Sequence, residues 1–140
     1  MNSLQIGYYR DAILSLKQKR TNGKSNIAKP VLLLAIFDLI EEGHILGNKI
    51  LFDKELMVIY ERIFKNYSEI VTPIVYPYYY MRNDGFYYIK GKAEKKTPSV
   101  KYIQENIEYA YFADDLWEML QNKPVRDDFK RQIIDYFLND

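Results

Sequence analysis

The chain has 140 residues, 48% of them hydrophobic and 28% charged, which is typical of a single globular domain (residues 1–140) and excludes wholesale disorder. It has no cysteine and one histidine, His44, which excludes disulfides, thiol nucleophiles and multi-histidine metal sites. The longest apolar stretch, residues 31–37, is too short to span a bilayer, and the N-terminus does not look like a secretory signal. We therefore expect a cytoplasmic protein without contact to a membrane.

The net charge of +1 hides an uneven distribution of charge along the sequence. Residues 12–37 carry five basic side chains and no acidic one, and residues 82–101 carry six basic against two acidic. Residues 38–69 have seven acidic against four basic, and residues 102–140 have nine against four. This alternation predicts a surface with separate basic and acidic regions.

The first half of the chain is predicted to form helices at residues 2–20, 31–42 and 54–67, and a short strand at residues 49–52. Pro30 suits the first turn of the second helix, and Gly43 suits its end. This helix is apolar almost all round, so we expect it to be the buried centre of the fold. Asp53 is placed to cap the third helix. Residues 21–26 are small and polar and indicate a loop.

The middle of the chain is predicted to be extended. Residues 71–77 contain two prolines, which disfavour helical conformation in the residues that precede them. Residues 78–82 and 86–90 are aromatic runs that flank an Asp-Gly turn, a strong signal for a β-hairpin. A solvated loop should follow, and then helices at residues 106–111, 114–121 and 124–138. The fold class expected is α+β, a helical body with a small β-hairpin, similar to a winged helix.

The chain carries little that indicates catalysis. His44 follows the end of the second helix, where a histidine is most simply a turn residue near the helix dipole. Adjacent carboxylates such as Glu41 and Glu42 point to different helix faces, and no pattern of a metal-dependent nuclease or of a phosphate-binding glycine loop is present. We expect no catalytic residue, no metal ligand and no cofactor.

Two features favour nucleic-acid binding. A basic loop precedes the second helix, and a tyrosine-rich segment with a basic tail contains six of the fourteen tyrosines between residues 76 and 88. Lysines supply phosphate contacts, and tyrosines supply flat faces. Alternatively, the lysines are solvated surface residues and the tyrosines are core residues with a wet hydroxyl, and several of the six must face the core in any case.

Several strings of the sequence resemble one domain family in their order and spacing. They are residues 28–35 (AKPVLLLA), 38–43 (DLIEEG), 48–50 (NKI), 76–87 (YPYYYMRNDGFY), 109–112 (YAYF) and 115–120 (DLWEML). The family is the sulfur-binding domain found at the N-terminal side of HNH-type, modification-dependent (type IV) restriction endonucleases. The resemblance spans about residues 10–138.

This resemblance implies a DNA-binding targeting domain of a restriction system. Its partner would be double-stranded DNA with a phosphorothioate, in which sulfur replaces a non-bridging phosphate oxygen, and a fused or associated nuclease domain would cut that DNA. The family's basic residue falls on Lys29, its tyrosine–proline pair on Tyr76 and Pro77, its position three residues further on Tyr80, and the arginine before the turn on Arg82. Lys24, from the loop at residues 21–26, is added to these five residues, and the six together are the predicted DNA-binding site.

Three other classes of function stay open at the level of sequence. A general DNA-binding domain of the winged-helix type would read ordinary bases and show no preference for sulfur. A protein-interaction module would use the tyrosine-rich surface to dock a partner, since tyrosine is enriched in interfaces. A stand-alone enzyme is the weakest alternative.

Overall fold

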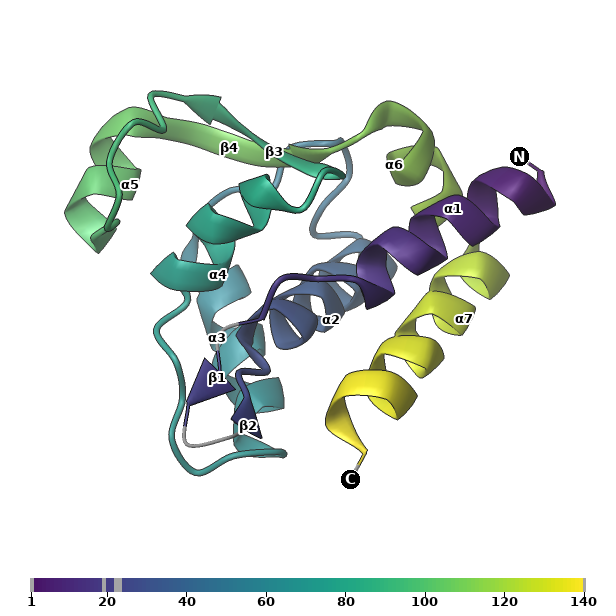
Figure 1. Cartoon of the computed structure of the whole chain (residues 1–140). Coiled ribbons are helices and arrows are strands. Elements are labelled where there is room, and N and C mark those ends of the chain that lie inside the picture. The colour runs from purple at the N-terminus through teal and green to yellow at the C-terminus, as the bar shows by residue number, and fades with distance from the viewer. Residues whose placement is uncertain (1, 19, 22–23, 140) are drawn as a thin grey trace.

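The computed structural model describes residues 2–18, 20–21 and 24–139, without the side chains of residues 20, 21, 24 and 25. In chain order the elements are α1 (Ser3–Leu14), β1 (Arg20–Thr21), β2 (Lys24–Ser25), α2 (Ala28–Glu41), α3 (Lys54–Lys65), α4 (Val75–Tyr80), the 3-10 turn η1 (Met81–Asn83), β3 (Tyr87–Gly91), α5 (Val100–Asn106), β4 (Ile107–Phe112), α6 (Asp114–Leu120), α7 (Lys123–Ile133) and the π-helical turn η2 (Ile134–Leu138). A helical body carries a small antiparallel sheet on one side (Figure 1), so the predicted α+β class is confirmed.

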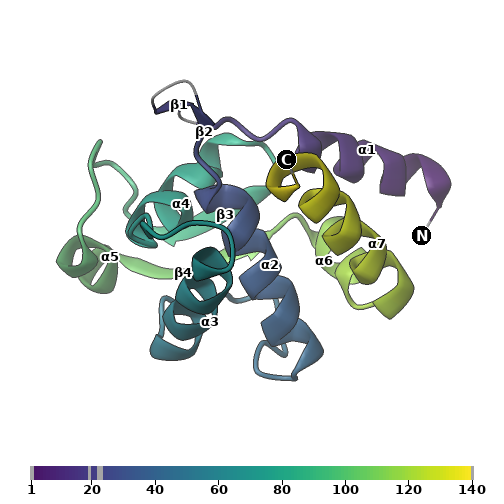
Figure 2. The ribbon, with the colours of Figure 1, turned by 90° about the horizontal axis from the view of Figure 1, so that it is seen from below.

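The hydrophobic core is built around α2. This helix is buried over most of its length, and Val31, Leu32 and Leu33 have no exposed surface at all. Helices α3, α4 and α7 pack against it, and α1 lies alongside α7 (Figures 1 and 2). The prediction of a central buried helix is therefore confirmed. No helix in the described part of the chain is both long and apolar enough to cross a membrane.

The main sheet consists of β3 and β4, which run across one side of the helical body (Figure 1). Tyr87 pairs with Phe112 and Lys90 with Tyr109, and the register shifts at Gly91, which has a φ of 136°. Ile50 bridges to Ala110 through two backbone hydrogen bonds of 2.7 and 2.9 Å. This bridge is the only pairing in the predicted strand at residues 49–52 that the structure describes.

The predicted hairpin at residues 78–90 is wrong, because its first strand is part of the helix α4. Two prolines did not prevent this helix. Pro73 precedes it, and Pro77 lies in its first turn, where a missing N–H is tolerated. Pro77 has no N–H to donate to the Pro73 carbonyl, and this carbonyl accepts the Tyr76 N–H at 3.2 Å.

The partner of β3 comes from further along the chain. The predicted helix at residues 106–111 is wrong, because residues 107–112 form the strand β4, and the short helix α5 lies between the two strands in the chain. Their burial pattern places Ile107, Ala110 and Phe112 in the core. The first helix also differs from the prediction, since α1 ends at Leu14 and the expected polar loop contains the paired two-residue strands β1 and β2.

Candidate functional site

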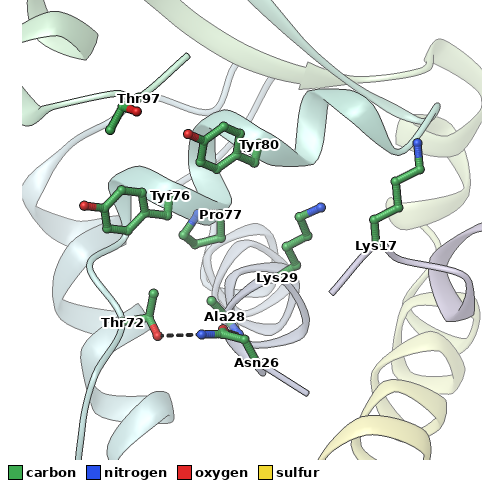
Figure 3. A pocket seen from close by; sticks show the side chains of 9 residues that line it. All are labelled: Lys17, Asn26, Ala28, Lys29, Thr72, Tyr76, Pro77, Tyr80 and Thr97. Carbon is green, nitrogen blue, oxygen red and sulfur yellow. Dashed lines mark hydrogen bonds between the residues drawn. The ribbon is translucent and has the colours of Figure 1, made fainter. Parts of the chain in front are cut away.

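A pocket of about 610 Å³ opens where the chain around the start of α2 meets the distant segment that contains α4. It lies between the segment that leads into α2, the N-terminal end of α2 and the helix α4 (Figure 3). The lining residues are Lys17, Asn26, Ala28, Lys29, Thr72, Tyr76, Pro77, Tyr80 and Thr97. More than forty residues separate Lys29 from Tyr76, so the fold and not local sequence creates this arrangement.

One side of the pocket is apolar. Ala28 and Pro77 are buried, and the rings of Tyr76 and Tyr80 lie one helical turn apart on α4. The two rings are nearly parallel, at an interplanar angle of 6° with centroids 6.4 Å apart (Figure 3). Tyr76 is 39% exposed, so its ring is accessible at the rim. This side offers flat, weakly polar surface to a ligand.

The rest of the pocket is polar and lies just before the helix α2. Asn26 accepts the Ala28 N–H at 2.7 Å and donates its side-chain amide to the Thr72 hydroxyl at 3.0 Å (Figure 3). These bonds join the start of α2 to the segment before α4. Because the positive end of a helix dipole lies at its N-terminus, α2 adds to the attraction of the pocket for an anion.

Lys29 is held by a buried carboxylate. Its ammonium donates to Asp84 Oδ2 at 2.6 Å, and the Asp84 side chain is only 2% exposed. Asp84 Oδ1 accepts the backbone N–H of Lys17 at 2.8 Å, and the Lys17 ammonium donates to the Asn83 carbonyl at 3.2 Å. The turn that contains Asp84 is thus fastened to both lysines of the pocket.

Tyrosine hydroxyls hold a basic segment, residues 92–101, next to the pocket. Tyr79 and Tyr80 donate to the carbonyls of Lys95 and Lys96, and Tyr102 donates to the carbonyl of Lys92 at 2.5 Å. We call residues 92–101 the basic loop, although its last two residues begin α5, since the segment contains four lysines and one glutamate. Its backbone is anchored while most of its side chains are exposed.

Of the six residues predicted from the sequence, four line the pocket: Lys29, Tyr76, Pro77 and Tyr80. Arg82 is not among the described lining residues. The guanidinium carbon of Arg82 lies 3.9 Å from the centre of the Tyr79 ring, and its Nη1 donates to the Tyr79 carbonyl at 3.1 Å. The backbone of Lys24 belongs to β2, whereas its side chain lies outside the described part of the structure.

Sequence reasoning missed several residues of the site. Asn26 could have been found, because an asparagine two residues before a helix commonly bonds a backbone N–H at its start. Asp84 appeared only as a turn residue, and nothing in the sequence showed that it would pair with a lysine 55 residues away. Thr72 and Thr97 carried no signal.

The tyrosines divide between core and surface. Tyr78, Tyr79 and Tyr87 are buried, which confirms that several of the six face the core. The Tyr78 hydroxyl donates to the Ile50 carbonyl at 2.7 Å, and the Tyr87 hydroxyl to the Tyr78 carbonyl at 2.7 Å. Burial raises the pKa of both hydroxyls above the ordinary value, so they stay protonated donors.

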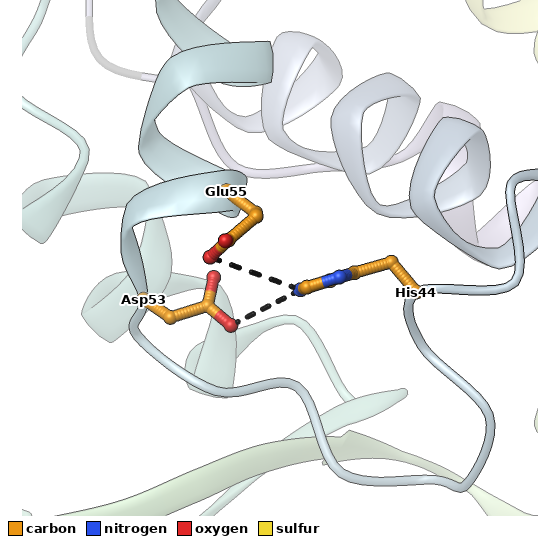
Figure 4. A group of neighbouring side chains, drawn as sticks. All are labelled: His44, Asp53 and Glu55. Carbon is orange, nitrogen blue, oxygen red and sulfur yellow. Dashed lines mark hydrogen bonds and ion pairs between the residues drawn. The ribbon is translucent and has the colours of Figure 1, made fainter.

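A second group of polar side chains, His44, Asp53 and Glu55, lies where the connection from α2 meets the first turn of α3 (Figure 4). His44 Nε2 is 3.3 Å from Asp53 Oδ2 and 4.0 Å from Glu55 Oε2. Their ligand atoms are close enough together to hold a divalent cation. All three are partly exposed, and Asp53 also caps α3 by accepting the Leu56 N–H at 3.0 Å. Capping and pairing with the imidazole explain this arrangement without a metal.

No family model matches the chain, and no curated protein matches it. The pocket beside the basic loop combines an ammonium group, a helix N-terminus, an apolar edge and two tyrosine rings. Chemically this set suits an anion that carries some apolar or polarizable surface.

Proposed function

We propose that this chain is a non-catalytic DNA-binding module that recognises a phosphorothioate linkage in double-stranded DNA. It would bring a fused or associated nuclease domain to the modified DNA, as the targeting domain of a modification-dependent restriction system. The observation that carries the proposal is the pocket: Lys29, Tyr76, Pro77 and Tyr80, which the resemblance assigns to sulfur recognition, line one cavity next to a basic loop.

The chemistry of the pocket suits sulfur better than oxygen. Sulfur is larger, more polarizable and less strongly hydrated than a phosphate oxygen, so it loses less on leaving water for a partly apolar site. Pro77, Ala28 and the tyrosine rings provide that apolar contact. The aliphatic stem of Lys29 lines the same cavity, while its ammonium is directed at Asp84.

Neighbouring phosphates would supply most of the affinity. Lys95 and Lys96 of the basic loop lie beside the pocket, since Tyr79 and Tyr80 donate to their carbonyls and the next residue, Thr97, lines the cavity. Such contacts release counterions and carry no sequence information. They position the duplex, and the pocket then distinguishes one linkage from the others.

The test is fluorescence anisotropy with pairs of short duplexes that differ only in one stereopure phosphorothioate, pooled over several sequence contexts. We expect the modified duplexes to bind at least tenfold more tightly, which is about 1.4 kcal/mol. Equal binding of both members of each pair would contradict sulfur recognition and support a general DNA-binding domain. Binding of neither at low salt would favour the protein-interaction alternative.

The pocket is tested by Tyr76→Ala, with Tyr88→Ala as the matched control. Tyr76 and Tyr88 are 39% and 40% exposed, but only Tyr76 lines the pocket. Tyr76→Ala should reduce the preference for the phosphorothioate while Tyr88→Ala leaves it unchanged. An equal loss of affinity for both DNAs in Tyr76→Ala would contradict the role assigned to this ring.

A further inference from the structure

Asp84 is the one acidic side chain that bonds directly to lining residues of the pocket, among those the structure describes. It ends the turn η1, and its carboxylate is almost completely buried. One oxygen accepts the backbone N–H of Lys17 at 2.8 Å, and the other accepts the Lys29 ammonium at 2.6 Å. An acid in this position is unexpected in a site that should attract the DNA backbone.

The carboxylate changes what Lys29 can offer to a ligand. The Lys29 side chain is 13% exposed, so little water screens the pair, and the two charges largely offset one another. A ligand atom in the pocket therefore meets an ion pair of zero net charge where a free ammonium would otherwise be. Lys17 keeps its full charge, because its ammonium donates to the neutral Asn83 carbonyl, but it is directed away from Tyr76, Pro77 and Ala28 (Figure 3).

We infer that Asp84 determines the specificity of the pocket by neutralising Lys29, so that a strongly hydrated anionic oxygen is disfavoured and weakly hydrated sulfur is accepted. A phosphate oxygen gives up strong hydrogen bonds to water on entering the pocket and needs a full cation to compensate. Sulfur gives up less, so the weakened Lys29 is sufficient. Specificity then arises because the ion pair attracts a phosphate oxygen too weakly to offset its lost hydration. This inference rests on the proposed function.

The first test is Asp84→Asn, which keeps an acceptor for the Lys17 N–H and removes the charge. Released from the carboxylate, Lys29 should raise the affinity for unmodified duplex roughly tenfold, since hydrogen bonds to charged groups are the strong ones. The phosphorothioate duplex should gain less, so the preference shrinks. The slope of log affinity against log salt for unmodified DNA should steepen by about 0.9, one phosphate contact.

Two further variants separate this effect from a general change in charge. Asp127→Asn removes the same charge from an exposed position on α7, outside the pocket, and should leave the preference unchanged. Adding Lys29→Met to Asp84→Asn should abolish the gain in affinity for unmodified DNA. A gain that persists in the double variant would overturn the inference, because the gain could not then come from Lys29.

A measurement on the unaltered protein covers the case in which Asp84→Asn does not fold. An uncharged methylphosphonate is placed in turn at the linkage where sulfur is preferred and at neighbouring linkages. If the pocket presents a neutral pair, the substitution at the preferred linkage costs less affinity than at the others. A larger loss there would show that Lys29 acts as a free cation and would overturn the inference.

The outcomes distinguish failure of the proposed function from failure of the inference about Asp84. If the unaltered protein shows no preference for phosphorothioate, the proposed function fails whatever Asp84 does. If it shows the preference and Asp84→Asn, folded under the conditions of the assay, retains it in full, the inference about Asp84 alone fails. Asp84 would then serve only to fasten the turn at residues 83–85 to the segment after α1.

Discussion

At the scale of single residues, the pair of Lys29 and Asp84 affects the stability of the fold as well as the proposed specificity of the pocket. A buried ion pair adds little net stability, because both charges have lost their hydration, but removing one partner leaves the other buried and uncompensated. The side chains of Lys29 and Asp84 are 13% and 2% exposed, so this asymmetry should be pronounced here.

Lys29→Met is therefore expected to lower the free energy of unfolding by about 3–5 kcal/mol, since the Asp84 carboxylate loses its cation. The double variant with Asp84→Asn should recover a large part of that loss, because no buried charge remains. Chemical denaturation of the three proteins measures both values. A double variant that is as unstable as Lys29→Met alone would show that the loss comes from packing of the lysine stem.

At the scale of elements, ion pairs fasten α7 to the C-terminal half of α2. Arg126, which is 6% exposed, donates to the Leu120 carbonyl at 2.6 Å and to Glu41. Lys123 approaches Glu41 at 2.7 Å, and Lys130 approaches Asp38 at 2.8 Å. The hydrogen bond from Lys123 and then that from Arg126 hold the pKa of Glu41 below its ordinary value of 4.5.

This shift predicts a loss of stability in acid. Glu41 binds its proton less readily in the folded protein, so its contribution is complete above the ordinary carboxyl pKa and disappears as the pH falls through the lowered one. Glu41→Gln should therefore reduce the decline of the unfolding free energy below about pH 4.5. Glu42→Gln is the control, since Glu42 forms none of the ion pairs found among the described residues. An equal effect of both variants would contradict the role of this contact.

The strand β3 depends on a glycine at its bulge. A Cβ atom added to Gly91 would lie 2.2 Å from the Asn106 carbonyl oxygen, which is backbone and cannot move without separating β3 from the start of β4. Gly91→Ala should thus lower the melting temperature far more than Gly85→Ala, where only the positive φ of 87° is strained and the space is open. Thermal unfolding compares the two, and similar losses would argue against the steric clash.

A comparison of the helices and strands with the sequence shows which of them could be predicted from it. The 3.6-residue periodicity, Pro30 and Asp53 located α2 and α3, because helix signals are local. The pairing of β3 with β4 crosses the intervening loop and α5, so an adjacent Asp-Gly turn suggested the wrong partner. Four site residues were identified through the resemblance, whereas Asp84 required the tertiary structure.

At the scale of the whole molecule, charge is arranged along α2. Its N-terminal end meets the pocket beside the lysines of the basic loop, and its C-terminal end leads to Asp53 and Glu55. Lys29 and Glu41 add little to this difference, because each is paired with opposite charge. The two ends of this 14-residue helix lie about 20 Å apart, which is about two and a half Debye lengths at physiological salt. If the proposed function holds, a DNA backbone is attracted more strongly to the first end than to the second.

This polarity predicts where loss of a lysine matters. Lys95→Ala and Lys96→Ala should each reduce the slope of log affinity against log salt by about 0.9 for unmodified duplex, if each lysine contacts one phosphate. Lys54→Ala removes a lysine next to the acidic end and should leave the slope unchanged. Salt titrations followed by anisotropy measure these slopes. Equal slopes for all three variants would place the DNA elsewhere on the surface.

The central claim is that the pocket at the start of α2 contacts the modified linkage. Backbone NMR spectra of two complexes, with duplexes that differ only in one sulfur atom, test it most directly, because differences between them report on residues near that atom. We predict that the largest differences fall on Ala28, Lys29, Tyr76 and Tyr80. Differences centred on other residues, or identical spectra of the two complexes, would contradict the account.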